Sequence, residues 1–126
     1  MESIETIKRI LSESKTIAVV GLSAKWNRPS HFAAKYMKDH GYKIIPVNPA
    51  YEEVLGEKCY KSLLDIPEPV DIVDIFRRSE DVPPIVEDAI RIGAKVIWMQ
   101  LTVVNEEAAA KAREAGLEVV MDRCVK

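Results

Sequence analysis

The chain has 126 residues, of which 48% are hydrophobic and 30% charged, and its formal net charge is −2. This length and composition fit a single globular domain over residues 1–126, and the small net charge argues against a nucleic-acid partner. No apolar run reaches the roughly 18 residues that a membrane span needs, and the amphipathic N-terminal segment lacks the apolar stretch of a signal peptide. We therefore expect a cytoplasmic protein without a membrane-inserted part.

Short apolar runs alternate with helical patterns along the chain. After an amphipathic helix at residues 3–13, the runs predict strands at Thr16–Val20, Tyr42–Val47, Val70–Phe76, Lys95–Met99 and Leu117–Met121. Residues 50–64 are less regular, with an extended piece near Lys58–Tyr60 and a helical turn at Ser62–Leu64. Since strands that alternate with helices form right-handed βαβ units, we predict a Rossmann-like, doubly wound, three-layer α/β/α domain. Its sheet should hold about five mostly parallel strands, with the first strand at the centre.

Single residues also predict local structure. Pro46 has no N–H, so the second strand should end there or lie at a sheet edge. Asn105 is expected to cap the last helix, and either Ser79 or Asp81 the helix before it. Trp98 falls within an apolar run and is expected in the core.

The loop after the first strand has the composition of a phosphate-binding site. Gly21 ends the strand, and a helix begins near Ser30. A strand, a glycine turn and a helix N-terminus together present backbone N–H groups and a positive helix end to an anion. Ser23 can add a hydroxyl, and Lys25 and Arg28 can add charge-assisted bonds, each worth roughly 1.5–3 kcal/mol where water is excluded. The loop therefore predicts a ligand that carries phosphate.

Doubly wound sheets bind ligands outside the carboxyl ends of their strands, at the point where the strand order reverses. The polar residues that directly follow the predicted strands should therefore share one edge. These are Gly21–Ser30, Asn48 and Pro49, Arg77 and Arg78, Gln100 and Leu101, and Asp122–Cys124.

A dinucleotide site would require G-x-G-x-x-G after the first strand and an acidic residue at the end of the second. Only Gly21 is present in that loop, and Asn48 stands at the end of the second strand. Two cysteines and two histidines provide neither a disulfide framework nor a metal-site spacing. No Walker A motif, zinc-protease motif or complete catalytic triad is evident. Whether the protein is an enzyme stays open, and an NAD(P)-dependent Rossmann enzyme remains an alternative.

Five segments, taken in order, resemble a known family. They are IAVVGLSAKWNRPSHFAAKYM, YKIIPVNPAY, VDIVDIFRR, KVIWMQL and MDRC. This combination resembles the small single-domain CoA-binding proteins, which are similar to the CoA-binding domain of the succinyl-CoA synthetase α subunit. The resemblance covers about residues 14–126. The catalytic phosphohistidine of the synthetase lies in a second domain outside this match, so the resemblance implies binding and no ligase reaction.

The resemblance also implies roles for individual residues. The loop around the CoA phosphates would comprise Gly21, Leu22, Ser23, Ala24, Lys25, Arg28, Pro29 and Ser30. A second wall would comprise Val47, Asn48, Pro49 and Tyr51. The adenosine end or its 3′-phosphate would be flanked by Ile75, Phe76, Arg77 and Arg78. The pantetheine arm would face Met99, Gln100 and Leu101.

The leading hypothesis is a non-catalytic module that binds coenzyme A or an acyl-CoA. Besides the NAD(P)-dependent enzyme, a CoA-binding subunit that works with a separate acyl-CoA ligase chain is a further alternative, and a homodimer is possible. Cys124 is the one candidate redox thiol, because its place on the binding edge would allow a mixed disulfide with the CoA thiol. The other interpretation of Cys124 is a small buried residue.

Overall fold

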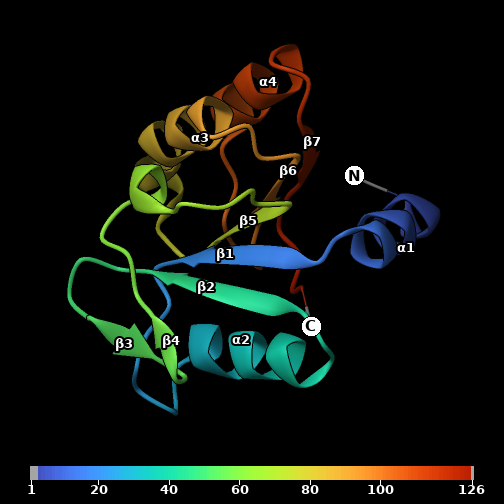
Figure 1. The fold of residues 1–126 in the computed structure, drawn as a ribbon. Coiled ribbons are helices and arrows are strands. Elements are labelled where there is room, and N and C mark those ends of the chain that lie inside the picture. Colours follow the sequence, from blue (N-terminus) through green and yellow to red (C-terminus); the bar gives the residue numbers. More distant parts are fainter. Residues whose placement is uncertain (1–2, 126) are drawn as a thin grey trace.

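A computed structural model describes residues 3–125 of the chain, with five longer strands, a short hairpin and four α-helices among them (Figure 1). The longer strands are β1 (Thr16–Val20), β2 (Lys43–Val47), β5 (Ile72–Ile75), β6 (Val96–Met99) and β7 (Glu118–Val120). The helices are α1 (Ile4–Glu13), α2 (Pro29–Asp39), α3 (Val82–Arg91) and α4 (Glu106–Glu114). The remaining elements are the hairpin β3 (Glu53–Val54) and β4 (Glu57–Lys58) and the 3₁₀ turns η1 (Leu63–Asp65) and η2 (Ser79–Asp81).

The five longer strands form one parallel sheet in the order β2-β1-β5-β6-β7. The expected Rossmann-like, doubly wound α/β fold is confirmed. The expectation that the first strand is central is wrong, because β1 lies next to the edge strand β2 and β5 takes the centre. The chain returns from β2 across β1 and then adds all later strands on that side, so the strand order reverses between β1 and β5. Pro46 lies in the edge strand β2, as predicted.

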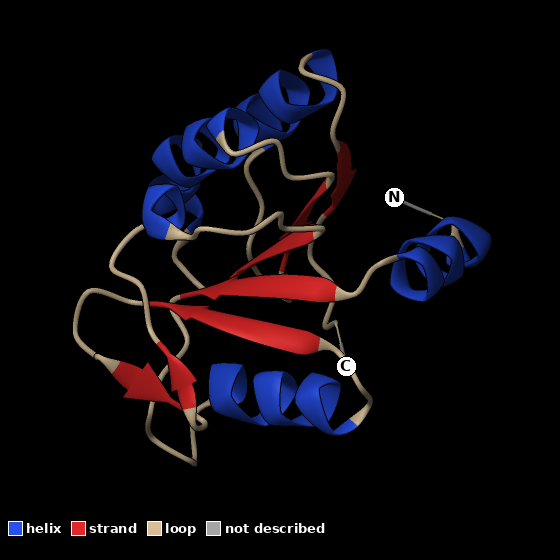
Figure 2. Ribbon diagram, in the orientation of Figure 1, coloured by secondary structure: helices blue, strands red, loops and turns tan. Residues whose placement is uncertain are grey.

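Helices cover both faces of the sheet (Figure 2). On one face α3 and α4 pack over a core that includes Ala18 and Val73, and on the other α1 and α2 pack over Ile17 and Val19. Successive β1 side chains thus point to opposite faces, and both faces are buried, which explains the uninterrupted apolar run. Trp98 is buried in the second core, as expected.

Two helix starts show how tertiary contacts compete with local caps. The Asn105 side chain accepts a hydrogen bond from the Ala108 N–H at 3.0 Å and caps α4 as predicted. Asp81, one of the two residues predicted to cap α3, does occupy the N-cap position of that helix, but no side-chain cap hydrogen bond forms there. Ser79 Oγ instead accepts from the Val104 N–H at 3.0 Å, and the Asp81 carboxylate makes no cap hydrogen bond at α3. Both side chains are engaged near the carboxyl edge of the sheet.

Within residues 3–125, no helix has the length and apolar character needed to cross a bilayer. In the same part of the chain, no three histidine, cysteine or acidic side chains are grouped so that they could hold a metal ion.

Candidate functional site

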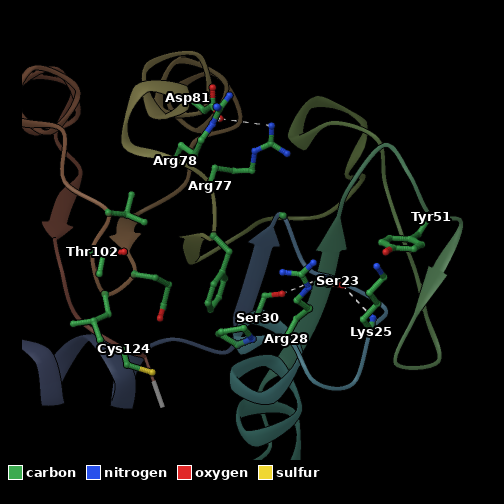
Figure 3. A pocket seen from close by; sticks show the side chains of 16 residues that line it. Ser23, Lys25, Arg28, Ser30, Tyr51, Arg77, Arg78, Asp81, Thr102 and Cys124 are labelled. Atoms are coloured by element: carbon green, nitrogen blue, oxygen red, sulfur yellow. Dashed lines mark hydrogen bonds and ion pairs between the residues drawn. The ribbon is translucent and has the colours of Figure 1, made fainter.

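An open groove of about 850 Å³ lies at the carboxyl ends of β1, β5 and β6 (Figure 3). It spans the point between β1 and β5 where the strand order reverses, which is where sheets of this kind bind ligands. The β1–α2 loop contributes Gly21, Ser23, Lys25, Arg28, Pro29 and Ser30 to the lining. The segments after β5 and β6 contribute Phe76, Arg77, Arg78, Asp81, Gln100, Leu101, Thr102 and Val103, and Tyr51 and Cys124 complete it.

The β1–α2 loop is held by side chains from its own two ends. Ser30 Oγ, which is buried, accepts a hydrogen bond from the Ser23 N–H at 3.0 Å. Ser23 Oγ accepts from the Lys25 N–H at 3.1 Å, and His31 Nδ1 lies 3.0 Å from the Ser23 carbonyl oxygen. These contacts fix the loop against the first turn of α2 before any ligand arrives, which reduces the entropy cost of binding.

The N-terminus of α2 offers fewer free amides than a usual helix start. Pro29 occupies the first helical position and has no N–H, and the His31 N–H already donates to the Arg28 carbonyl at 3.0 Å. An anion at this helix start would therefore meet fewer free backbone N–H groups than a usual helix N-terminus offers. The hydroxyl of Ser23 and the cations of the loop are the side-chain groups available.

Four cationic side chains and one carboxylate line the groove, although the whole chain is net negative. Lys25 and Arg28 come from the β1–α2 loop, and among the described residues no acidic side chain lies within ion-pair distance of either. Arg77 and Arg78 share Asp81, at 3.8 Å and 3.2 Å respectively (Figure 3). The cations approach the groove from two sides, and this arrangement fits a ligand with several phosphates.

Gln100, which lines the groove, belongs to a buried acid–amide pair. Asp74, on β5, is 1% exposed, and Gln100 is 3% exposed. Gln100 Nε2 donates a hydrogen bond to Asp74 Oδ1. Burial raises the pKa of Asp74 to about 8, and the hydrogen bond from Gln100 opposes that rise only in part. The Asp74 side chain is therefore mostly protonated at neutral pH, and it adds little negative charge near the groove.

Most of the predicted site residues come together in the groove, but seven do not line it. The side chains of Leu22, Val47, Ile75 and Met99 are buried in the core, and Ala24, Asn48 and Pro49 lie outside the lining. Asn48 instead connects the end of β2 to the β1–α2 loop, because its Nδ2 donates a hydrogen bond to the Leu22 carbonyl at 3.1 Å.

Sequence reasoning missed Asp81, Thr102 and Val103 as lining residues. Each lies a few positions beyond the residues that directly follow a strand. A longer window after each strand end would have included them.

The two cysteines have different environments. Cys59 is buried, and its Sγ donates to the Asn48 carbonyl at 3.4 Å. Cys124 is exposed and lines the groove, so the interpretation of Cys124 as a small buried residue is wrong. Trp98 Nε1 donates to the Arg123 carbonyl at 2.7 Å and holds the segment that carries Cys124 beside β6.

The fold and the groove define a Rossmann-like binding domain with a cationic site at the carboxyl edge of its sheet. Comparison with known proteins identifies the class more closely: the family model described as CoA binding domain matches residues 15–126, and the chain belongs to this family.

The chain has relatives of two kinds. It is 51% identical over 120 residues to the protein YneT of Bacillus subtilis (strain 168), a match that covers 95% of this chain and 89% of YneT. A protein from Pyrococcus horikoshii OT3 has a similar structure, with a TM-score of 0.96 at 48% identity, and the match covers 98% of this chain and 87% of that one. The chain is also 34% identical over 87 residues to the ADP-forming acetate–CoA ligase of Methanocaldococcus jannaschii; that match covers 69% of this chain and only 12% of the ligase.

Proposed function

We propose that this protein binds coenzyme A or an acyl-CoA in the groove and acts as a binding module without a reaction of its own. The observation that carries the proposal is the group of four cations around a groove at the reversal point of the sheet. Coenzyme A carries a diphosphate and a 3′-phosphate, and the cations of the groove come from two separate segments. Two groups of cations on separate segments support the assignment of one group to the diphosphate and the other to the 3′-phosphate.

The contacts expected for each part of the ligand follow from the lining. Lys25, Arg28 and the Ser23 hydroxyl would hold the diphosphate at the preformed loop. Arg77 and Arg78 would face the adenosine end, where the 3′-phosphate would compete with Asp81 for their guanidinium groups. The pantetheine arm would then run past Gln100 and Leu101 toward Cys124.

A subunit role beside a ligase chain is a second candidate, because the chain matches only 12% of a CoA ligase that contains a related region. Leu101, which lines the groove, and the nearby Val104 are 62% and 40% exposed and offer apolar surface for such a partner. Co-purification of an acyl-CoA ligase chain from native lysate would support this role, and its absence would leave the isolated module.

Isothermal titration with CoA, NAD⁺ and NADP⁺ tests the proposal. We expect binding of CoA and no binding of either nicotinamide dinucleotide. Arg28→Ala should weaken CoA binding roughly 10- to 150-fold, the effect of losing one charge-assisted phosphate contact of roughly 1.5–3 kcal/mol. Arg91→Ala, an exposed change on α3 away from the groove, is the matched control and should bind like the wild type. Binding of NAD⁺ or NADP⁺ in place of CoA would overturn the assignment.

The same titration can separate the two groups of cations. Dephospho-CoA lacks the 3′-phosphate and should bind more weakly than CoA. In Arg78→Ala this difference should largely disappear, whereas in Arg28→Ala both ligands should weaken by the same factor. The opposite pattern would reverse the proposed direction of the ligand in the groove.

Cys124 should form a mixed disulfide when the protein is treated with the disulfide of CoA. The Cys124 thiolate attacks one sulfur of that disulfide, and one molecule of CoA thiol leaves. Mass spectrometry should locate the adduct on Cys124 and not on Cys59, which is buried and whose pKa is raised by that burial. Oxidised glutathione at the same concentration is the control, because it lacks the adenosine and phosphates that the groove would hold. Equal rates with the two disulfides would mean that exposure alone, and not binding, directs the reaction.

A further inference from the structure

A second cavity, of about 320 Å³, lies on the face of the sheet that α1 and α2 cover. Ile7 and Leu11 of α1, Met37 of α2, and Trp98 of β6 are among its lining residues. Cys124 lines both this cavity and the groove, so the two spaces lie on either side of one residue. A ligand that follows the groove as far as Cys124 therefore comes close to the second cavity.

The polar side chains around this cavity are largely engaged with the protein itself. The Tyr42 hydroxyl donates to the Leu11 carbonyl, and Trp98 Nε1 donates to the Arg123 carbonyl. His40 Nδ1 lies 2.7 Å from the Tyr36 carbonyl, and the rings of these two residues are stacked. Apart from these groups, the Tyr36 hydroxyl, the Cys124 thiol and the Arg123 side chain, the walls are aliphatic and aromatic carbon, so the inner part of the cavity suits an apolar group.

The distance between the strand ends allows one ligand to occupy both the groove and the second cavity. The Arg123 N–H donates to the Met99 carbonyl, which places the segment before Cys124 at the end of β6. The ends of β1 and β6 are two strand spacings apart, about 10 Å, and an extended pantetheine arm can span that distance. The sulfur of a CoA thioester held by its phosphates at the β1–α2 loop would then lie near Cys124.

We propose that this second cavity is an acyl subsite and that the ligand of the protein is an acyl-CoA with a short, unbranched, apolar acyl group. The inference rests on the proposed function, because only a CoA held in the groove brings a thioester to Cys124. The groove binds the CoA moiety. The cavity binds the acyl chain and raises the affinity in proportion to the apolar surface that the chain buries there.

Titration with CoA, acetyl-CoA, butyryl-CoA and hexanoyl-CoA tests the subsite. Each methylene that enters the cavity should tighten binding about fourfold, which corresponds to about 0.8 kcal/mol. Hexanoyl-CoA should therefore bind far more tightly than acetyl-CoA. Equal affinity for all four ligands, or a loss of affinity with chain length, would overturn the acyl subsite and leave CoA binding intact. Failure of every ligand, CoA included, would overturn the proposed function and the subsite together.

A pair of variants tests the location. Leu11→Ser places a polar side chain on the cavity wall. It should reduce the increase in binding affinity from acetyl-CoA to hexanoyl-CoA and leave the affinity for CoA unchanged. Leu64→Ser is the matched control, because Leu64 is 49% exposed on η1 and lines neither space. If the affinity of Leu11→Ser increased from acetyl-CoA to hexanoyl-CoA as much as that of the wild type, the acyl chain would lie elsewhere.

Fluorescence gives a readout that does not depend on a cavity variant. Trp26→Phe removes the other tryptophan and leaves Trp98 as the single one in the chain. Because Trp98 lines the cavity, its emission should shift with hexanoyl-CoA and change little with CoA. The same emission with both ligands would count against occupancy of the cavity.

Discussion

Asp74→Asn is expected to stabilise the protein at neutral pH, by up to roughly 4 kcal/mol at pH 7. Burial raises the pKa of Asp74 to about 8, so the folded protein holds a proton there that the unfolded chain releases near pH 4. Since the folded state binds more protons, the free energy of unfolding falls as the pH rises from about 4 to about 8 and is level above that. Asparagine cannot ionise, and its side-chain carbonyl can still accept from Gln100, so this fall should disappear.

Urea unfolding of both proteins at pH 4, 6 and 8 measures this difference. The two stabilities should be similar near pH 4 and should separate as the pH rises. A parallel pH dependence in the two proteins would show that Asp74 does not hold a proton in the folded state.

Asp71→Asn, three residues before Asp74, is the matched control. Its effect on the free energy of unfolding at neutral pH should have the opposite sign. Burial of Asp71 favours its neutral form, but hydrogen bonds from the Lys15 and Thr16 N–H groups and the charge of Lys95 outweigh that effect and lower its pKa. The stabilising effect of the Asp71 carboxylate is therefore present at neutral pH and lost as the pH falls through its folded pKa. The asparagine variant should be less stable than the wild type at pH 7, with a smaller difference in acid.

Gly21→Ala is expected to cost about 3 kcal/mol of stability and to abolish or strongly weaken ligand binding. Gly21 has a φ of +87°, and a Cβ built there lies 2.3 Å from the Phe76 carbonyl oxygen and 3.0 Å from Arg77 Cδ. The left-handed backbone costs an alanine roughly 1–2 kcal/mol, and forcing the end of β5 away adds roughly 1–3 kcal/mol. The same displacement would separate the β1–α2 loop from Arg77 across the groove.

Gly116→Ala isolates the steric part of that effect. Gly116 has nearly the same backbone angle, with φ of +90°, but nothing lies within 4 Å of a Cβ built on it. The free energy of unfolding of Gly116→Ala, measured with urea, should be lower than that of the wild type by only roughly 1–2 kcal/mol. The variant should bind CoA like the wild type. If Gly21→Ala were no more harmful than Gly116→Ala, the close contact between the β1–α2 loop and the end of β5 would be contradicted.

The five strands of the main sheet could be predicted because each is a largely apolar and buried run, and their limits were correct to within two residues. Val70–Phe76 was predicted where β5 covers Ile72–Ile75, for example. The short hairpin β3–β4 was predicted only as an extended piece near Lys58–Tyr60. The position of β1 within the sheet could not be predicted, because the apolar pattern of a strand does not say on which side of the sheet the next strand is added. That choice depends on the paths of the later crossovers.

Competing side-chain partners, some local and some distant in the chain, were the main source of error at the site. Asp81 and Ser79 have the residue types of helix caps, but Arg77 and Arg78 pair with the first and the Val104 N–H binds the second. The groove itself was predictable in outline, because its cations directly follow strands. The environment of Asp74 was not, since its partner Gln100 lies 26 residues further along the chain.

Backbone amide chemical shifts of the ¹⁵N-labelled protein, recorded during addition of CoA, test the central claim most directly. If CoA binds in the groove, the largest changes should fall on Gly21, Ser23 and Lys25, on Arg77 and Arg78, and on residues 100–103. The amide chemical shifts at the amino ends of the strands, where Lys15, Asp71 and Lys95 lie, should change little. Changes concentrated at these amino ends, or no changes at CoA concentrations that saturate related binding domains, would contradict the assignment of the groove as a CoA site.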